Sequence, residues 1–349
     1  MRALTVEPGK PHTARLDDVA EPPLSDGGVL VQSLALGICG TDREILSGEY
    51  GSAPRGESRL ILGHESLGRV LEAPPQSGLV RDDLVVGIVR RPDPVPCSCC
   101  AVGDWDMCLN GGYSERGIKD RHGYGSERFR IEPEFAVKID TMLGLLGVLL
   151  EPASILAKAW DHTERVGRRL HASQPRTLLV TGAGPIGLLA ALMGSQRGLD
   201  VYVFDRPFEP TKAQLVQDLG GTYDDDTDRL DHLRPDILME CSGAPALIAR
   251  VLSQTAPGGI LSLIGVTSPG RDLEIDLGRV CRTLVLDNHT IFGTVNANRR
   301  HYEIAARALA RADPTWLRRL ITRLVPIVRW EEAMQYRSGD VKVVIEIDN

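Results

Sequence analysis

The sequence lacks any block of Lys and Arg that resembles a nucleic-acid-binding patch or a polybasic membrane anchor. Its 349 residues include 40 basic and 47 acidic side chains, for a formal net charge of -7. This balance keeps a protein dissolved and gives it no electrostatic reason to bind a polyanion. We therefore expect neither nucleic acid nor a membrane among its partners.

The N-terminus, MRALTVEPGKPH, has no apolar core followed by a small-residue cleavage site, so we do not expect secretion by a signal peptide. We therefore expect a cytoplasmic protein whose cysteines stay reduced. Residues 177–196 carry no charge and are numerous enough to suggest a membrane span. Three spaced glycines and Pro185 interrupt the first half of this run, and we interpret it as a strand, a turn and a helix.

The sequence has no internal repeat and no low-complexity tract, and its length exceeds the usual size of one core, so we expect two domains. The first part contains short runs rich in β-branched residues, which predict a β-barrel: VLVQSLAL from Val29, LGRVLE from Leu67 and LVVGIV from Leu84.

After about residue 150 the pattern changes to alternating strands and helices. The runs TLLVTG, VYVFD, DILMECSG and ILSLIGV are apolar throughout, and helical stretches such as EPTKAQLVQDLGG lie between them. This pattern predicts an α/β domain with a doubly wound parallel sheet covered on both faces. The run VKVVIEI from Val341 is β-like again, so we expect the C-terminus to complete the first domain.

A glycine motif in the second part indicates a nucleotide site. Gly182, Gly184 and Gly187 form G-x-G-x-x-G after a predicted strand, with Pro185 and Ile186 inside the motif. Such a turn brings backbone N–H groups and a helix dipole to a pyrophosphate. A glycine-rich turn without a ligand is the alternative, and the strand context makes it the weaker one.

The next strand ends in Asp205, 18 residues after the last glycine of the motif. A carboxylate there accepts hydrogen bonds from the ribose hydroxyls and repels a 2′-phosphate, which favours NAD over NADP. Arg206 follows directly and could bind that phosphate instead, so NADP remains the alternative.

Three separate segments carry side chains suited to a catalytic zinc ion. They are GICGTD with Cys39, LGHESLG with His64 and Glu65, and LLEPAS with Glu151. A thiolate, an imidazole and a carboxylate can hold zinc with one position open for substrate. Taken singly, the cysteine could be a small core residue, the histidine a bonded polar residue, and Glu151 a carboxylate at a helix start.

The order and approximate spacing of these motifs resemble the zinc-dependent medium-chain dehydrogenases. Within that family the chain is most similar to the glucose 1-dehydrogenase branch, through CGTDREI, YSERGI, HGYGSERF and FGTVNAN. The resemblance implies a GroES-like catalytic domain, residues 1–152 and 296–349, and a Rossmann domain, residues 153–295. It also implies a homodimer or homotetramer that pairs through the sheet edge near HTIFG.

The resemblance further assigns residues. Cys39 and His64 become zinc ligands, and Glu65 and Glu151 compete for the third place. Thr41 is placed to relay a proton or contact the substrate oxygen, or else to cap a helix starting near Asp42. The resemblance also implies that Glu115 and Asn296 bind the hydroxyl groups of the sugar. Without it, Glu115 would be interpreted as a solvated charge in a loop and Asn296 as a turn residue. Further cofactor contacts fall at strand ends, at Ser242, Gly243, Gly265, Val266 and Thr294.

The implied reaction transfers hydride from C1 of a glucose-like aldose to NAD(P) and gives a lactone. A polyol or secondary-alcohol dehydrogenase of the same family is one alternative. A nucleotide-binding protein with a vestigial zinc site is another, although retention of the four candidate ligands argues against it.

The stretch VPCSCCAVGDWDMC holds four of the seven cysteines. The family often carries a structural zinc on C-x2-C-x2-C-x7-C, and Cys97, Cys100 and Cys108 match its last three places. Pro94 occupies the first place and cannot bind zinc. Cys99 could supply the missing thiolate, although adjacent side chains point apart in an extended chain. A structural zinc is favoured over free thiols, and a disulfide is the least favoured.

Overall fold

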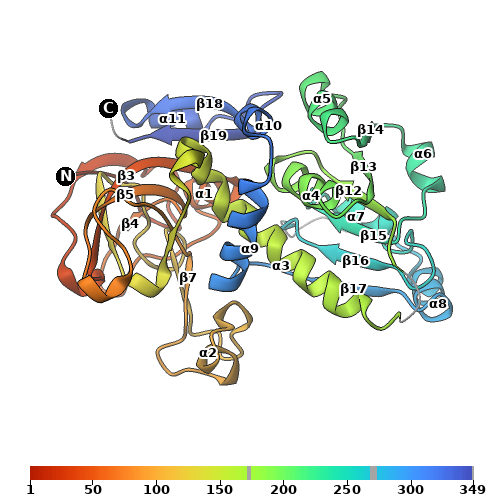
Figure 1. The fold of residues 1–349 in the computed structure, drawn as a ribbon, viewed down its shortest axis with the longest axis horizontal. Coiled ribbons are helices and arrows are strands. Elements are labelled where there is room, and N and C mark those ends of the chain that lie inside the picture. Colours follow the sequence, from red (N-terminus) through yellow and green to blue (C-terminus); the bar gives the residue numbers. More distant parts are fainter. Residues whose placement is uncertain (171–173, 268–272, 348–349) are drawn as a thin grey trace. The chain divides into compact units, whose positions relative to one another are not determined.

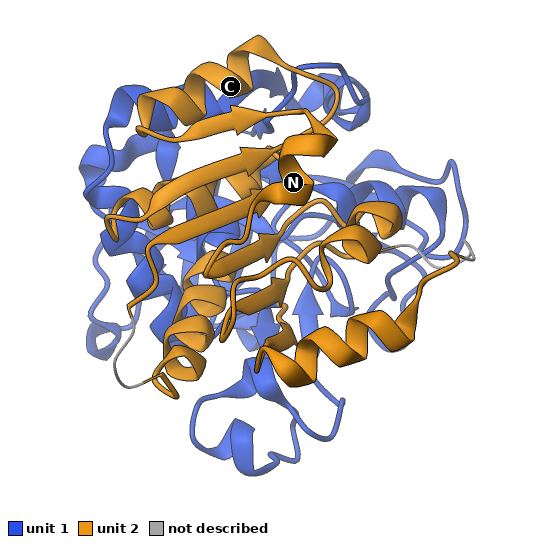
Figure 2. Cartoon of the chain, turned by 90° about the vertical axis from the view of Figure 1, so that its right-hand side faces the viewer, with its two compact units in different colours: residues 1–154, 296–349 blue, residues 155–295 orange. Residues whose placement is uncertain are grey.

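The computed structural model describes residues 1–170, 174–267 and 273–347 (Figure 1). The chain folds into two compact units, residues 1–154 with 296–349 and residues 155–295, which Figure 2 colours separately. Helix α3, Leu150–Gly167, begins in the first unit and continues into the second. The predicted fold class, a β-rich domain and an α/β domain with a parallel sheet, is confirmed.

The described strands of the first unit form one seven-stranded and two three-stranded sheets. Its strands are β1 Arg2–Val6, β2 Arg15–Asp18, β3 Val29–Ile38, β4 Leu60–Ile61, β5 Glu65–Glu72, β6 Leu84–Gly87, β7 Arg90–Arg91, β8 Ser114–Arg116, β9 Asp120–Arg121, β10 Arg128–Ile131, β11 Ala136–Lys138, β18 Ile321–Pro326 and β19 Lys342–Glu346. Its helices are α1 Gly40–Ser47, α2 Ser98–Ala101, α9 Arg299–Ala310, α10 Pro314–Leu320 and α11 Trp330–Met334.

Strand β3 organises the large sheet. It pairs with β5 on one side and with β19 on the other, within the order β11-β6-β5-β3-β19-β18, and β10 pairs with it as well. Alternate residues at the start of β3 are buried and its last four are all buried, which suits its central position. Because Val343 of β19 lies opposite Ile38, the C-terminal strand completes the first unit as predicted, next to the segment that leads to Cys39.

The second unit contains a six-stranded parallel sheet in the order β14-β13-β12-β15-β16-β17. Its strands contribute Leu179, Phe204 and Leu238 to a buried hydrophobic cluster. The strands are β12 Thr177–Thr181, β13 Asp200–Phe204, β14 Thr222–Asp224, β15 Ile237–Glu240, β16 Ile260–Leu263 and β17 Thr290–Gly293. The helices between them are α4 Pro185–Ser195, α5 Pro210–Asp218, α6 Thr227–His232, α7 Pro245–Val251 and α8 Leu277–Leu286.

The strand order switches direction at β12, which lies between β13 and β15, and ligands of doubly wound sheets bind at such a switch point. The uncharged run 177–196 forms β12, a turn and α4, as predicted. A different helical segment, Thr141–Gly167, is long and apolar enough to cross a membrane, but 78% of its most apolar window is buried inside the protein. Such burial is typical of a core helix.

Candidate metal and cofactor sites

Cys39 lies where β3 passes into α1. It is the N-cap of this helix: its Sγ accepts the N–H of Thr41 at 3.3 Å, and its own N–H donates to Asp42 Oδ2 at 2.9 Å. The helix therefore begins at Gly40, and the alternative that Thr41 is its cap is wrong. Thr41 is instead the second helical residue and is half-buried. These two reciprocal hydrogen bonds form a capping box, which holds the Cys39 sulfur in position at the start of α1.

His64 comes from the segment before β5, and its imidazole contacts two residues of the Cys39 segment. Its Nε2 lies 3.1 Å from Cys39 Sγ, and its Nδ1 lies 3.4 Å from Asp42 Oδ1. His64 and Asp42 are both buried. Although burial opposes the shift, the charged imidazole and the Cys39 N–H lower the pKa of Asp42. A carboxylate in this position orients an imidazole whose other nitrogen faces a metal.

Glu65 is held by a residue near the other end of the chain. Lys342 Nζ lies 2.7 and 2.6 Å from its two carboxylate oxygens and also donates to Ile38 O. The three adjacent strands β5, β3 and β19 supply this arrangement. Gly37 makes room for it, since a Cβ there would approach Glu65 Oε2 to 2.1 Å. The sequence reading missed Lys342, although a single lysine in the apolar run VKVVIEI was a usable signal.

Three of the four candidate ligands converge. One donor atom from each of Cys39, His64 and Glu65 lies within 4.8 Å of the others. Sulfur, imidazole nitrogen and carboxylate oxygen are the donors that zinc takes in proteins, so these residues fit the ion. Glu151 lies outside this group. It is buried near the start of α3, and burial raises its pKa to about 7.

Glu115 and Asn296 meet in the first unit, although 181 positions separate them in the sequence. Glu115 lies in β8 and is only 4% exposed, so its reading as a solvated loop charge is wrong. Arg90 donates to its Oε1 through Nε at 3.1 Å and Nη2 at 2.9 Å. Asn296 donates to the same oxygen from a turn-like backbone with φ +63°. In the described part of the chain, Oε2 has no hydrogen-bond donor.

The four-cysteine stretch brings three thiols together: Cys97, Cys100 and Cys108 have sulfurs within 4.8 Å of one another. Cys99 lies outside this group, and all seven cysteines of the chain are free. Backbone N–H groups of Leu109 and Cys100 lower the pKa of Cys97 to about 6, whereas burial raises that of Cys100 to about 11. Three thiols fit part of a closed zinc site.

The glycine motif has the shape that a pyrophosphate needs. A Cβ on Gly187 would lie 1.7 Å from Gly182 O, so only glycine lets α4 pack this closely. A Cβ on Gly184 would meet nothing within 4 Å, and no side chain caps the helix. Pro185 and Ile186 form the first turn of α4. The open N-terminus therefore fits an anionic cofactor.

Asp205 follows β13 and is not a lone acid: Lys212 Nζ lies 2.9 Å from its Oδ2. Arg206 beside it is exposed. Lys212 and Arg206 therefore bring two positive charges next to the Asp205 carboxylate. The prediction of NAD rested mainly on that carboxylate. The other predicted cofactor residues follow the ends of β15, β16 and β17, and they are Ser242, Gly243, Gly265, Val266 and Thr294.

Two family models match most of the chain, and known proteins match nearly all of it. Residues 25–141 match the alcohol dehydrogenase GroES-like domain, and residues 144–347 match the glucose dehydrogenase C-terminus. Glucose 1-dehydrogenase of Thermoproteus tenax is 39% identical over 99% of both chains, and glucose 1-dehydrogenase 2 of Vulcanisaeta moutnovskia is 38% identical over 99% of both.

A solved structure agrees with these relatives. Haloferax mediterranei glucose dehydrogenase in complex with NADP, Zn and gluconolactone matches with a TM-score of 0.92, 30% identity and complete coverage of both chains. The chain therefore belongs to the glucose 1-dehydrogenase branch of the zinc-dependent medium-chain dehydrogenases.

Proposed function

We propose that this protein is a zinc-dependent glucose 1-dehydrogenase that transfers hydride from C1 of an aldose to NAD(P) and yields the lactone. One observation carries the proposal: the donor atoms of Cys39, His64 and Glu65 converge, although 25 positions separate the first two. The Haloferax relative, which holds NADP, Zn and gluconolactone, supports it.

Zinc, when bound, acts as a Lewis acid that makes the C1 hydroxyl of the sugar more acidic. The residues of this chain then have distinct tasks. Cys39, His64 and Glu65 hold the ion, Asp42 orients the imidazole, and Lys342 fixes the Glu65 carboxylate. We assign Glu65 rather than Glu151 as the third donor, because Glu65 belongs to the convergent group.

Glu151 is the proposed proton acceptor. A carboxyl with a pKa of about 7 can take a proton and release it again near neutral pH. Thr41 remains the proposed contact of the substrate oxygen, since it is the helical residue whose N–H bonds the Cys39 sulfur. Replacing Glu151 by Gln is expected to lower kcat by about 10²-fold or more with zinc content retained. Loss of zinc in this variant would instead make Glu151 a ligand.

Glu115 and Asn296 are the proposed contacts of the sugar hydroxyls. Because Arg90 and Asn296 both bond Oε1, the second oxygen of Glu115 remains to accept a hydroxyl. Glu115→Gln is therefore expected to raise KM for aldoses sharply and to leave zinc content intact. Glu115→Ala would also leave the Arg90 charge unpaired and lower stability. Unchanged sugar kinetics in Glu115→Gln would contradict this role.

The nicotinamide cofactor is the point where the sequence reading needs revision. Asp205 favoured NAD, but it is bonded to Lys212, and the Haloferax relative holds NADP. We infer that the site accepts NADP, with Arg206 and Lys212 near the 2′-phosphate. Replacing Arg206 by Ala should raise KM for NADP at least about tenfold and change that for NAD little, since a charge-assisted bond is lost. Equal effects on both cofactors would contradict this inference.

The overall proposal is tested by initial rates with a panel of aldoses and polyols, each with NAD and NADP, beside metal analysis. We expect turnover with an aldose and lactone as product. A polyol or secondary alcohol as the best substrate would move the enzyme to the related dehydrogenases. No zinc and no cofactor reduction would favour a nucleotide-binding protein with a vestigial site.

Oligomerisation and location complete the proposal. We propose pairing through β17, because it is an edge strand of the six-stranded sheet and exposed edges pair readily. A monomer in light scattering would contradict this. A cytoplasmic location is supported by seven free cysteines. Disulfide-bonded protein, found by thiol trapping in extracts of the source cells, would contradict it.

A further inference from the structure

Arg116 is a buried arginine directly after Glu115 in β8. It is 3% exposed, and successive residues of a strand point to opposite faces. Its guanidinium donates to the carbonyl oxygens of Arg130 at 2.6 Å, His122 at 3.3 Å and Asp26 at 3.4 Å. These bonds satisfy part of the group, but they bring no negative charge to it.

No carboxylate among the described residues forms an ion pair with Arg116, and its enclosed Nε has no hydrogen-bond partner there. Burial, together with the nearby charges of Arg91 and Arg121, lowers its pKa to about 10. The neighbouring carboxylate, Glu132, already pairs with both Arg91 and Arg121. One carboxylate therefore pairs with two guanidinium groups, and the buried charge of Arg116 beside them has no ion-pair partner among the described residues.

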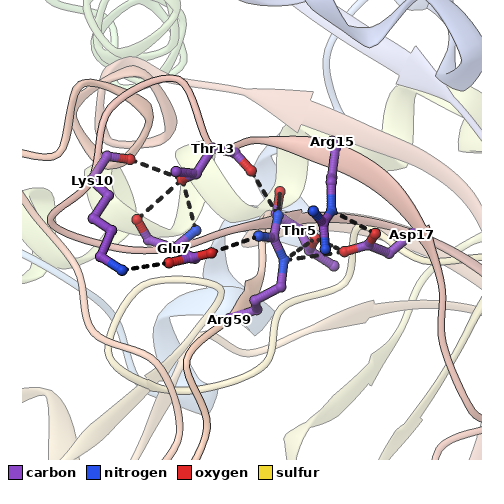
Figure 3. A network of polar contacts seen from close by, with 7 residues as sticks. All are labelled: Thr5, Glu7, Lys10, Thr13, Arg15, Asp17 and Arg59. Carbon is purple, nitrogen blue, oxygen red and sulfur yellow. Dashed lines mark hydrogen bonds and ion pairs between the residues drawn. The ribbon is translucent and has the colours of Figure 1, made fainter.

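Arg116 lines a cavity of about 600 Å³ in the first unit, together with Arg121, His122 and Arg130. Arg59 lines the same cavity, but its charge is matched, because it pairs with Glu7 at 3.2 Å and Asp17 at 3.1 Å (Figure 3). Arg116 has no such carboxylate among the described residues, and its guanidinium carbon lies 5.3 Å from the centroid of the Tyr124 ring instead.

None of the acidic residues that line the cavity forms an ion pair with Arg116 in the described part of the chain. Three of them pair with other side chains, Asp17 with Arg59, Glu21 with Arg128 and Glu57 with His122, and Asp120 accepts a hydrogen bond from the Ser52 hydroxyl. Asp26 contributes its backbone oxygen to Arg116. Among the described residues, Arg130 forms one ion pair, a long one of 3.8 Å to exposed Glu72. Arg116, Arg121 and Arg130 form the basic side of the cavity, and the carboxylates that pair with the latter two, Glu132 and Glu72, are not among the lining residues.

We propose that this cavity binds a small oxyanion, a phosphate or carboxylate group contacted by Arg121 and Arg130 and balanced by the buried charge of Arg116. Guanidinium groups match the geometry of such oxyanions and are more weakly hydrated than ammonium groups. The bound anion would offset charge that the fold itself leaves unpaired. The site uses none of the candidate metal, sugar or cofactor residues, so it stands independently of the proposed function.

Isothermal titration of the full-length protein with inorganic phosphate, and separately with gluconate, tests the proposal. Ionic strength is held constant and NADP is present in excess, so that the glycine loop is occupied. Arg121→Gln and Arg130→Gln each remove a rim contact. Arg329→Gln is the matched control, because Arg329 forms an exposed ion pair with Glu332 in the same unit and lies outside the cavity.

We expect saturable binding of at least one anion to the native protein and to Arg329→Gln. Each rim variant should bind it about tenfold more weakly, as expected for loss of one charge-assisted bond. Preference for phosphate or gluconate then identifies the group. No saturable binding of either anion, or equal binding by all variants, would overturn the proposal. Arg116→Met should abolish binding if it folds, but the rim variants decide the question without it.

Discussion

The two cysteine-bearing clusters of the first unit differ in what supports their sulfurs. Cys39 and His64 lie among buried charges, with Asp42 behind the imidazole and Lys342 bonded to Glu65. Cys97, by contrast, accepts backbone N–H groups at 3.3 and 3.5 Å and lies beside the thiols of Cys100 and Cys108. The number of cysteines is therefore a poor guide to the catalytic site.

The residues that orient the metal donors therefore indicate the position of the catalytic site better than the donors themselves do. A site that must keep a position open for substrate needs its few donors oriented by other groups. A closed cluster of thiols needs only a turn that gathers them. The group formed by Cys39, His64 and Glu65 has such orienting partners.

The largest effect is expected from Cys39→Ala. Loss of a ligand removes the Lewis acid, and several kcal/mol of transition-state stabilisation correspond to a fall of at least about 10³-fold in kcat/KM. Steady-state kinetics with an aldose and NADP would measure it. Cys281→Ala, at an exposed free cysteine on α8, is the control and should keep full activity. Substantial activity in Cys39→Ala would remove the basis for distinguishing the two clusters.

Lys342→Met tests the role of buried charge around the group of Cys39, His64 and Glu65. Without the ammonium group, Glu65 of the zinc-free protein stays buried as an unpaired carboxylate, and we expect the free energy of unfolding of that protein to fall by about 3–5 kcal/mol. Denaturant unfolding would measure the loss. Lys138→Met is the matched control, because Lys138 pairs with Asp83 at 2.7 Å but is 51% exposed, and such pairs contribute about 1 kcal/mol or less. Equal losses would contradict the argument.

Cys108→Ala should affect stability rather than chemistry. If three thiolates hold a second zinc, the zinc-to-protein ratio falls from near two to near one, the melting temperature drops, and kcat changes less than about twofold. Cys99→Ala should leave all three quantities unchanged, because Cys99 lies outside the group. Loss of zinc in Cys99→Ala would show that Cys99 is the fourth ligand. A zinc-to-protein ratio near one in the native protein would contradict a second zinc site at these thiols.

The smallest effect concerns pH in the metal-free protein. Because thiolate is the reactive form, alkylation of Cys97 should rise with pH and be half-maximal near pH 6, where its thiol titrates. Cys100, whose pKa is raised to about 11 by burial, should react slowly until far higher pH. Mass spectrometry of labelled peptides would separate the two. Reaction of both with a midpoint near pH 8.5 would contradict the backbone effect at Cys97.

Local sequence patterns predicted the strands, the glycine turn and the return of the C-terminus to the first unit. They could do so because burial patterns and turn residues are visible within short segments of the sequence. The pairing of residues distant in sequence was not predictable in this way. Lys342 reaches Glu65 only because β19, β3 and β5 are neighbours. Arg90 and Asn296 meet Glu115 only in the folded unit. The sequence therefore identified candidate ligands, but the groups that orient them required the fold.

The central claim is that the catalytic metal binds at Cys39 and His64. It is tested most directly by anomalous diffraction at the zinc edge from crystals grown with NADP and gluconolactone. We predict an anomalous peak within about 2.3 Å of Cys39 Sγ and about 2.1 Å of His64 Nε2, the usual zinc bond lengths, with the lactone next to it. A peak confined to the thiols of Cys97, Cys100 and Cys108, with none at His64, would contradict the account.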